Sequence, residues 1–447
     1  MQKILSILSL IMIMTSCEDF LDQPPTTGLS DDKLVDIPAM QALIYGAYHN
    51  TRAFISQPAL YGAGMIRDVQ IRNRAEYDQF FDHQLSTSMT GWMFNQGYSV
   101  LEQLNTVAVS PIEEMVGTVD EKNSILGDMH FLRALIYFEM NNYFALPSTG
   151  YSLPLVLEPV GVNDRVVCTP TEEVIRTIEE DIELARNYFK EVSGVANYNA
   201  ATALAARIYF FHQKYELAFA RANEVISQGP YIIEPDVATP FVPGGSSREI
   251  IFTIKYNSTD NQSPTDRIAE AYKASETVGF YILNPAGEAA QLVLSDTSDN
   301  RYKAFYSVDG DVTYIDGKYP TDQMDYIYLR LAEIYLIRAE ANIMVNNSVS
   351  QQDVDDINIL RQRANPESVL TAVPTVAEAL EILFGDRTRE LAFELGDHYL
   401  NVRRLEKGII RTPEEGTGMK PYSEYSDLLV FPFPEREVAI HDLNRNP

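Results

Sequence analysis

Strongly amphipathic helical segments recur along this chain, and they limit it to a mainly helical fold. In three of them an alanine is followed two residues later by Ile-Tyr and then by Phe or Leu: Ala134–Phe138, Ala206–Phe210 and Ala332–Leu336. Apolar residues three and four apart form one buried stripe on such a helix, and the small alanine lets a second helix approach closely. The pattern therefore predicts a mainly α protein.

The second segment continues into another helix over residues 214–226, where Ala218 and Ala222 lie one turn apart on the same face. This helix, short turn and helix resembles a tetratricopeptide unit of about 34 residues. The spacing between the segments is irregular, so a regular array is not expected. We predict tetratricopeptide-like helical pairs that form one globular unit.

Residues 227–325 differ in composition, because they are richer in Gly, Pro, Ser, Thr, Asp and Tyr. The apolar run Ile250–Ile254 is typical of a short strand. We predict a loop-rich insertion that carries short β-strands and projects from the helical scaffold. Loops held by a rigid scaffold are where binding residues concentrate.

The N-terminus has the features of a targeting segment. Lys3 precedes the apolar stretch Ile4–Met14, which is too short to span a bilayer and is typical of a secretory signal. Ser16 then stands directly before Cys17, which resembles the lipidation site of bacterial lipoproteins. We expect a signal peptide over 1–16, a tether over 17–36 lipidated at Cys17, and a single domain over 37–447. Two or more acyl chains on the cysteine would give stable membrane attachment.

Several function classes find no support in the sequence. The formal net charge of −28 would repel phosphate backbones, so nucleic acid is not an expected partner. The six histidines are scattered and no zinc-binding spacing occurs, so no metal site is predicted. No nucleophile elbow, phosphate loop or dinucleotide fingerprint appears, so we expect neither an enzyme nor a cofactor.

One group of charged residues has the spacing of an acid/base pair, and we interpret it as internal ion pairing that fixes helix packing. Its members fall three and four residues apart on one predicted helix: Arg387, Arg389, Glu390 and Glu394.

Several motifs, taken in order, resemble the SusD/RagB family of outer-membrane nutrient-binding lipoproteins. They are Phe20–Asp22 after Cys17, Arg133–Met140 with Leu153–Val156, Thr169–Ala185, Tyr198–Ile226, Leu329–Leu336 with Ala339–Ala341, Asn358–Ala364, Asp386–Leu395 and Phe431–Glu435. The chain departs from the family pattern at Asp386, where Glu is usual, and at residues 395–399. The resemblance covers nearly the whole chain after the signal segment.

The resemblance implies a lipid-anchored protein on the extracellular face of the outer membrane. There it would cap a SusC-like TonB-dependent transporter and pass it an oligosaccharide or a peptide.

The family's sites draw on the region around Trp92, the sole tryptophan, which lies at a predicted helix start with Asn95 one turn later. An indole stacks on the C–H face of a sugar ring, and an amide hydrogen-bonds its hydroxyls. The remaining predicted ligand-binding residues are Asp68, Arg72, Arg74, Tyr281 and Tyr306. Packing of Trp92, surface ion pairing of Asp68 and the arginines, and half-burial of the tyrosines are the open alternatives.

Three functional hypotheses stay open beside oligosaccharide import. A peptide-binding member of the family would share the fold, and a purely structural lid or scaffold would bind only the transporter. A surface glycoside hydrolase would need two carboxylates about 5–9 Å apart across a cleft, and we do not expect turnover.

Overall fold

The computed structural model describes residues 36–161, 164–259, 263–275 and 279–444. The predicted signal peptide, Cys17 and all but the last residue of the predicted tether lie outside these residues. Within the described part, no helix is both long and apolar enough to cross a membrane.

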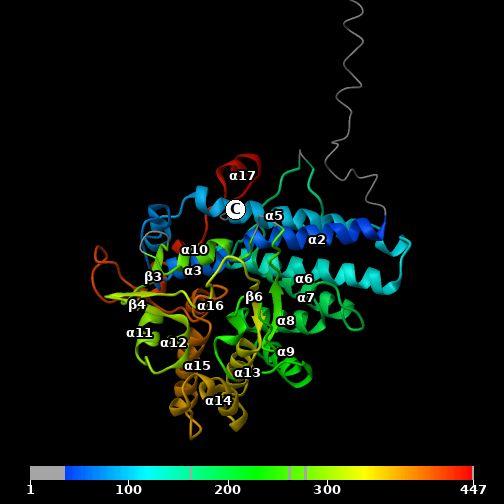
Figure 1. The fold of residues 1–447 in the computed structure, drawn as a ribbon. Helices are drawn as coiled ribbons and strands as arrows, with labels where there is room; N and C mark the ends of the chain where they lie inside the picture. The colour runs from blue at the N-terminus through cyan, green and yellow to red at the C-terminus, as the bar shows by residue number, and fades with distance from the viewer. Residues whose placement is uncertain (1–35, 162–163, 260–262, 276–278, 445–447) are drawn as a thin grey trace, which may run out of the picture.

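Helices make up most of the described chain (Figure 1). They are α2 (Ile37–Phe54), α3 (Gln57–Met65), α4 (Asp78–Phe81), α5 (Thr87–Val109), α6 (Val119–Phe144), α7 (Thr171–Tyr188), α8 (Tyr198–Phe211), α9 (Tyr215–Gln228), α10 (Asp266–Tyr272), α11 (Glu288–Leu294), α12 (Asn300–Phe305), α13 (Leu331–Asn346), α14 (Gln351–Ala364), α15 (Val376–Glu390), α16 (Asp397–Arg404) and α17 (Glu435–Ile440).

The strands are short and form four separate antiparallel pairs: β1 with β3, β2 with β6, β4 with β5, and β7 with β8. Their bounds are β1 (Val69–Ile71), β2 (Ile250–Ile254), β3 (Tyr281–Leu283), β4 (Ser307–Asp309), β5 (Val312–Tyr314), β6 (Tyr326–Arg330), β7 (Ile409–Ile410) and β8 (Met419–Lys420). The mainly α class with short strands in the insertion is therefore confirmed.

The helices form a succession of pairs, as the alanine pattern predicts. α6 packs on α7, α7 on α8, α8 on α9, α9 on α13 and α13 on α14, while α2 and α5 lie beside α6 (Figure 1). Ala218 and Ala222 are fully buried at the helix contacts, where their small side chains allow close packing.

Side-chain caps fix where three of these helices begin. Thr118 before α6, Ser350 before α14 and Thr375 before α15 each form a reciprocal capping box with an acidic residue three positions later. Each box satisfies backbone N–H groups that the first helical turn leaves without partners. The starts of these helices are therefore encoded locally.

Much of the predicted insertion belongs to the core instead of projecting from the scaffold. β2 is hydrogen-bonded to β6, which leads directly into α13. β3 pairs with β1, near the start of the described chain, and its three residues are all buried. The main cluster of buried apolar side chains extends from Ile37 to Leu443 and includes insertion residues such as Phe252 and Tyr272. The insertion therefore helps to build the wall of the site described next.

Candidate functional site

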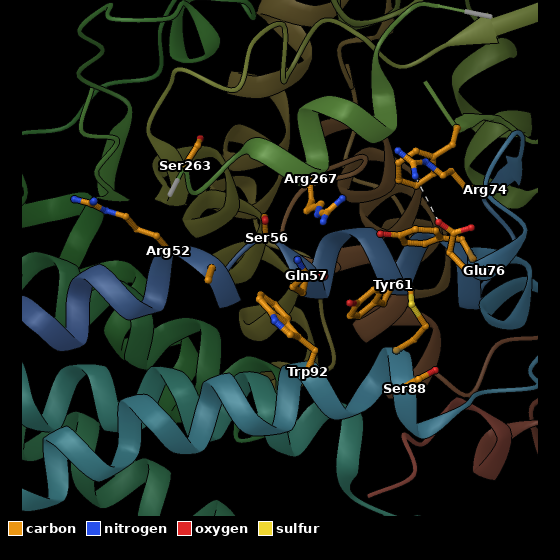
Figure 2. A pocket seen from close by; sticks show the side chains of 14 residues that line it. Arg52, Ser56, Gln57, Tyr61, Arg74, Glu76, Ser88, Trp92, Ser263 and Arg267 are labelled. Atoms are coloured by element: carbon orange, nitrogen blue, oxygen red, sulfur yellow. Dashed lines mark ion pairs between the residues drawn. The ribbon is translucent and has the colours of Figure 1, made fainter. Parts of the chain in front are cut away.

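A cavity of about 530 Å³ opens between α3, the first turns of α5 and α10 (Figure 2). Its lining combines aromatic rings, three arginines and small polar residues: Arg52, Ala53, Ser56, Gln57, Tyr61, Arg74, Glu76, Tyr77, Ser88, Met89, Trp92, Ser263, Arg267 and Phe280. Segments around residues 52–92 and 263–280 therefore meet here, although they are distant in the sequence.

Trp92 is presented to this cavity by α5. Its neighbours Gly91 and Phe94 face the opposite way: a Cβ on Gly91 would lie 3.2 Å from Pro434, and the Phe94 ring packs edge-on against Phe433. Trp92 is left 38% exposed, and its side chain points from α5 toward Gln57 (Figure 2). α5 begins at Thr87, so Trp92 lies in the second turn and the predicted helix start is wrong. The C-terminal segment passes so close to this position that it favours glycine there, even inside a helix.

Buried aromatic rings form the floor of the cavity. Tyr77 lies 4.6 Å from Phe280 between ring centroids, and Tyr61 stacks on Phe80 at 4.5 Å. Burial raises the pKa of Tyr61 and of Tyr77, and the charge of Arg267 counteracts part of this rise in both. The two hydroxyls therefore stay protonated as hydrogen-bond donors, and the Arg267 guanidinium acts on both of them.

Arg74 and Arg267 share one carboxylate. Arg74 forms an ion pair with Glu270, and Arg267 Nη1 lies 3.3 Å from the other oxygen of Glu270. Arg74 also lies over the Phe280 ring at 5.9 Å and 3.7 Å from a Glu76 oxygen. These contacts hold two guanidinium groups at the edge of the aromatic floor.

Of the predicted site residues, the structure brings Trp92 and Arg74 together in this cavity. Arg72 is half-buried and its backbone N–H donates to the Phe280 carbonyl at 2.8 Å, but its side chain does not line the cavity. Asn95 is exposed and lies on the wall of a second cavity of about 490 Å³, with Tyr98 and the segment around Pro154.

Two of the residues predicted to bind the ligand are buried away from this cavity. Asp68 is 3% exposed, and its carboxylate lies 2.6 Å from His398 Nδ1. Tyr281 is fully buried because β3 pairs with β1 and places its ring between Tyr77 and Tyr272. Neither side chain lines the cavity, so both are assigned to the core.

Tyr306 also lies away from the main cavity. Its ring stacks on Tyr302 at 5.8 Å, and the crevice beside it has a volume of only about 10 Å³. A space of this size is too small for a sugar ring, so Tyr306 has no ligand-sized cavity to line.

Sequence reasoning missed Arg267, Gln57 and Tyr61. Arg267 and Glu270 have the spacing of an ordinary surface ion pair on a helix, so their pattern gave no signal of a site. Gln57 and Tyr61 lie in α3, which is buried along its whole length. Gln57 and Tyr61 are already one turn apart on α3, and the approach of α10 brings Arg267 to them.

The interpretation of the charged group near residue 390 as internal ion pairing is confirmed. Arg387 pairs with Glu333 and Asp397, and Glu390 pairs with Arg330. Arg389 lies 3.6 Å from Asp386, and Glu394 accepts from Lys318 and Arg330. These ion pairs join α15 and the turn after it to β6, α13 and α16.

Within the part of the chain that the structure describes, no group of three or more His, Cys, Asp or Glu side chains is arranged to hold a metal ion.

The structure combines a mainly helical scaffold of helix pairs with a cavity at its side, and comparison with known proteins shows what it is similar to. The sequence model of the SusD family matches residues 250–427. A SusD-like protein of Formosa agariphila is 22% identical over 292 residues, which cover 57% of this chain and 52% of that protein. The match thus spans about half the length of the curated relative.

Solved structures share the fold over almost the whole chain. SusD superfamily proteins from Bacteroides thetaiotaomicron and Bacteroides vulgatus each superpose with a TM-score of 0.77, at 18% and 20% identity. The superpositions cover 92% and 91% of this chain and 100% and 97% of theirs. A SusD-like carbohydrate binding protein from Bacteroides vulgatus superposes with a TM-score of 0.76 at 15% identity, over 92% of this chain and 98% of its own. The chain is therefore similar to the SusD/RagB family in sequence over residues 250–427, and it shares the fold of SusD superfamily structures over most of its length.

Proposed function

We propose that this protein binds an oligosaccharide in the cavity beside Trp92 and delivers it to a SusC-like TonB-dependent transporter. In this proposal a lipid on Cys17 holds the protein on the extracellular face of the outer membrane. The observation that carries the proposal is the position of Trp92, which is 38% exposed on the wall of a cavity of about 530 Å³. Ligand cavities in proteins commonly have volumes of about 300–1,000 Å³.

The chemistry of the cavity suits a sugar ring. The flat indole of Trp92 offers a surface for the C–H face of a pyranose, and the polar groups around it offer hydrogen bonds to hydroxyls. Gln57 contributes an amide, and Arg74 and Arg267 contribute guanidinium donors. This combination complements an oligosaccharide, whose rings present an apolar C–H face surrounded by hydroxyls.

The similarity to the SusD family and the shared fold support a role in nutrient uptake, since SusD-like proteins are nutrient-uptake proteins. One solved neighbour with the same fold is named as a carbohydrate binding protein, which supports a saccharide ligand for this chain.

Binding without catalysis is part of the proposal. Glycoside hydrolysis requires a pair of carboxylates facing each other across the bond to be cleaved. Glu76 is the only carboxylate among the described residues that line this cavity, and it lies beside Arg74. The nearby Glu270 is held by Arg74 and Arg267. No second carboxylate is therefore placed to act as an acid or base in the cavity.

The test uses the full chain purified in detergent and a panel of oligosaccharides and peptides. Because Trp92 is the sole tryptophan, its fluorescence reports directly on the cavity, and calorimetry gives the affinity. We expect one class of oligosaccharide to give a saturable fluorescence change. Trp92→Ala should weaken calorimetric binding by about two- to tenfold, since an aromatic contact of this kind contributes about 0.5–1.5 kcal/mol.

Tyr45→Ala is the matched control, because Tyr45 is 58% exposed on α2 and does not line the cavity. It should leave affinity unchanged. Binding of peptides with no response to any saccharide would favour the peptide-binding alternative, and the absence of any small ligand would favour a scaffold on the transporter. The transporter part predicts that the protein co-purifies from outer membranes with a TonB-dependent barrel.

A further inference from the structure

The charge of the cavity is opposite to that of the chain. The whole sequence has 35 basic and 63 acidic residues, yet the cavity is lined by three arginines and one acid, Glu76. Resting on the function proposed above, we propose that the ligand is an acidic oligosaccharide, one that carries carboxylate or sulfate ester groups. A neutral oligosaccharide could accept hydrogen bonds from these guanidinium groups but would not use their charge.

Arg267 is the cation best placed to meet such a group. Its side chain is 56% exposed, and Figure 2 shows it pointing from α10 into the space beside Gln57 and Trp92. Its ion pair with Glu270 joins residues three apart on one helix at 3.3 Å, and exposed pairs of this kind contribute only about 0.3–0.5 kcal/mol. An anionic ligand can therefore engage this guanidinium without breaking a strong internal contact.

Arg74 supports the same interaction from beside Arg267, since both arginines contact Glu270. Its contact with Glu270 and its position over the Phe280 ring fix its orientation, while 39% of the side chain stays exposed. Glu270 does not line the cavity, so a ligand there meets the guanidinium groups and not the carboxylate behind them. A planar guanidinium donates two parallel hydrogen bonds to a carboxylate or to a sulfate, which favours both groups over a neutral hydroxyl.

The net charge of the protein determines the salt concentration at which the preference for an acidic ligand appears. At low salt the net charge of −28 repels any anion over long distances. At about 0.15 M ionic strength charges more than roughly 8 Å apart are largely screened, so the arginines at the cavity dominate over distant acids. The low-dielectric aromatic floor formed by Tyr77 and Phe280 further strengthens the local attraction.

An acidic peptide would use the same guanidinium groups, but it would leave the exposed indole of Trp92 without the sugar face that it fits. The observations therefore favour a saccharide, and acidic peptides serve as a test outcome.

The experiment compares matched ligands on the full chain at about 0.15 M salt. One pair is an oligogalacturonate and its methyl ester, which share a backbone and differ only in charge. The other pair is a sulfated oligogalactan and its desulfated form. We expect the charged member of at least one pair to bind about tenfold more tightly, and the pair that shows it identifies the group.

Two variants decide whether the cavity arginines cause the preference. Arg267→Gln should remove most of it, whereas Arg248→Gln, an exposed arginine outside the cavity, should retain it. Both should keep the wild-type unfolding midpoint. Equal binding of the charged and uncharged members would overturn this inference and leave saccharide binding intact. A preference for the charged member that Arg267→Gln does not reduce would do the same. Binding of acidic peptides alone, or of nothing, would overturn the proposed function as well.

Discussion

Replacing Arg330 with methionine tests whether the acids buried around α15 stabilise the fold. Arg330 is 2% exposed, and it contacts Glu249 at 3.0 Å, Glu390 at 2.7 Å and Glu394 at 2.8 Å. The connected network contains four cations and four acids, namely Arg301, Lys318, Arg330 and Arg363 with Glu249, Asp299, Glu390 and Glu394. Methionine keeps a long apolar side chain but leaves three cations for four buried acids.

The expected loss of unfolding free energy follows from this imbalance of buried charges. Removing one partner of a buried ion pair costs about 3–5 kcal/mol, because the other charge stays desolvated without compensation. Here Arg363, Arg301 and Lys318 still contact the acids, so we expect the lower end, about 3 kcal/mol. The control is Lys255→Met, because Lys255 is 70% exposed and pairs with Asp325 at the surface. An exposed pair of this kind contributes at most about 1 kcal/mol.

Guanidinium unfolding followed by circular dichroism measures both variants against the wild type. A loss for Arg330→Met that does not exceed that for Lys255→Met would refute the reasoning. It would show that the network contributes no more than a surface ion pair.

The pH dependence gives an independent check. Burial alone would raise the pKa of Glu390, but the charges of Arg363, Arg330 and Arg301 hold it well below its usual value. A lowered folded-state pKa stabilises the protein above the unfolded pKa, about 4.5, and this contribution is lost as the pH falls through the folded-state value. Without Arg330 the pKa of Glu390 is depressed less. The stability difference between wild type and variant should therefore be largest near neutral pH and shrink on acidification.

Two further predictions concern packing and a buried histidine. A Cβ at Gly46, inside α2, would have its nearest neighbour 3.6 Å away, so Gly46→Ala should raise the unfolding free energy by about 0.5–1 kcal/mol. A Cβ at Gly127 would lie 2.6 Å from the Phe189 ring, so Gly127→Ala should lower it by about 1–3 kcal/mol; equal effects in denaturant unfolding would contradict the packing. Burial lowers the pKa of His398, but the carboxylates of Asp68 and Glu288 outweigh this effect and raise it to about 10. The stability that this charged pair contributes is present below pH 6.5 and is lost as the pH rises toward 10. His398→Gln should therefore be most destabilising in acid and least destabilising at high pH. A pH-independent difference from the wild type would argue against the charged pair.

The helical scaffold was predictable because its signals are local. The spacing of Ala218 and Ala222, the capping residues Thr118 and Ser350, and the apolar run Ile250–Ile254 each act over a few residues. The structure places them in α9, at the starts of α6 and α14, and in β2. That Glu390 takes part in buried ion pairs was also predictable, but its partners Arg301, Arg330 and Arg363 lie on other segments and were not.

The site was predictable only in part. Trp92 and Arg74 belong to segments close in sequence, and they do line one cavity. Asp68 and Tyr281 have the same residue types as ordinary ligand-binding groups, yet they lie in the core. What buries Asp68 is His398, 330 positions away, and what buries Tyr281 is the pairing of β3 with β1. No local pattern records such partners.

The sequence by itself therefore determined the helix pairs and their caps, because periodicity and capping are properties of neighbouring residues. The tertiary structure alone decided which polar and aromatic side chains remain accessible, because burial depends on which distant segment packs against them. The approach of α10 to α3 and α5 brings Arg267 to Trp92. It gives a strongly acidic protein a cavity with a local excess of arginines.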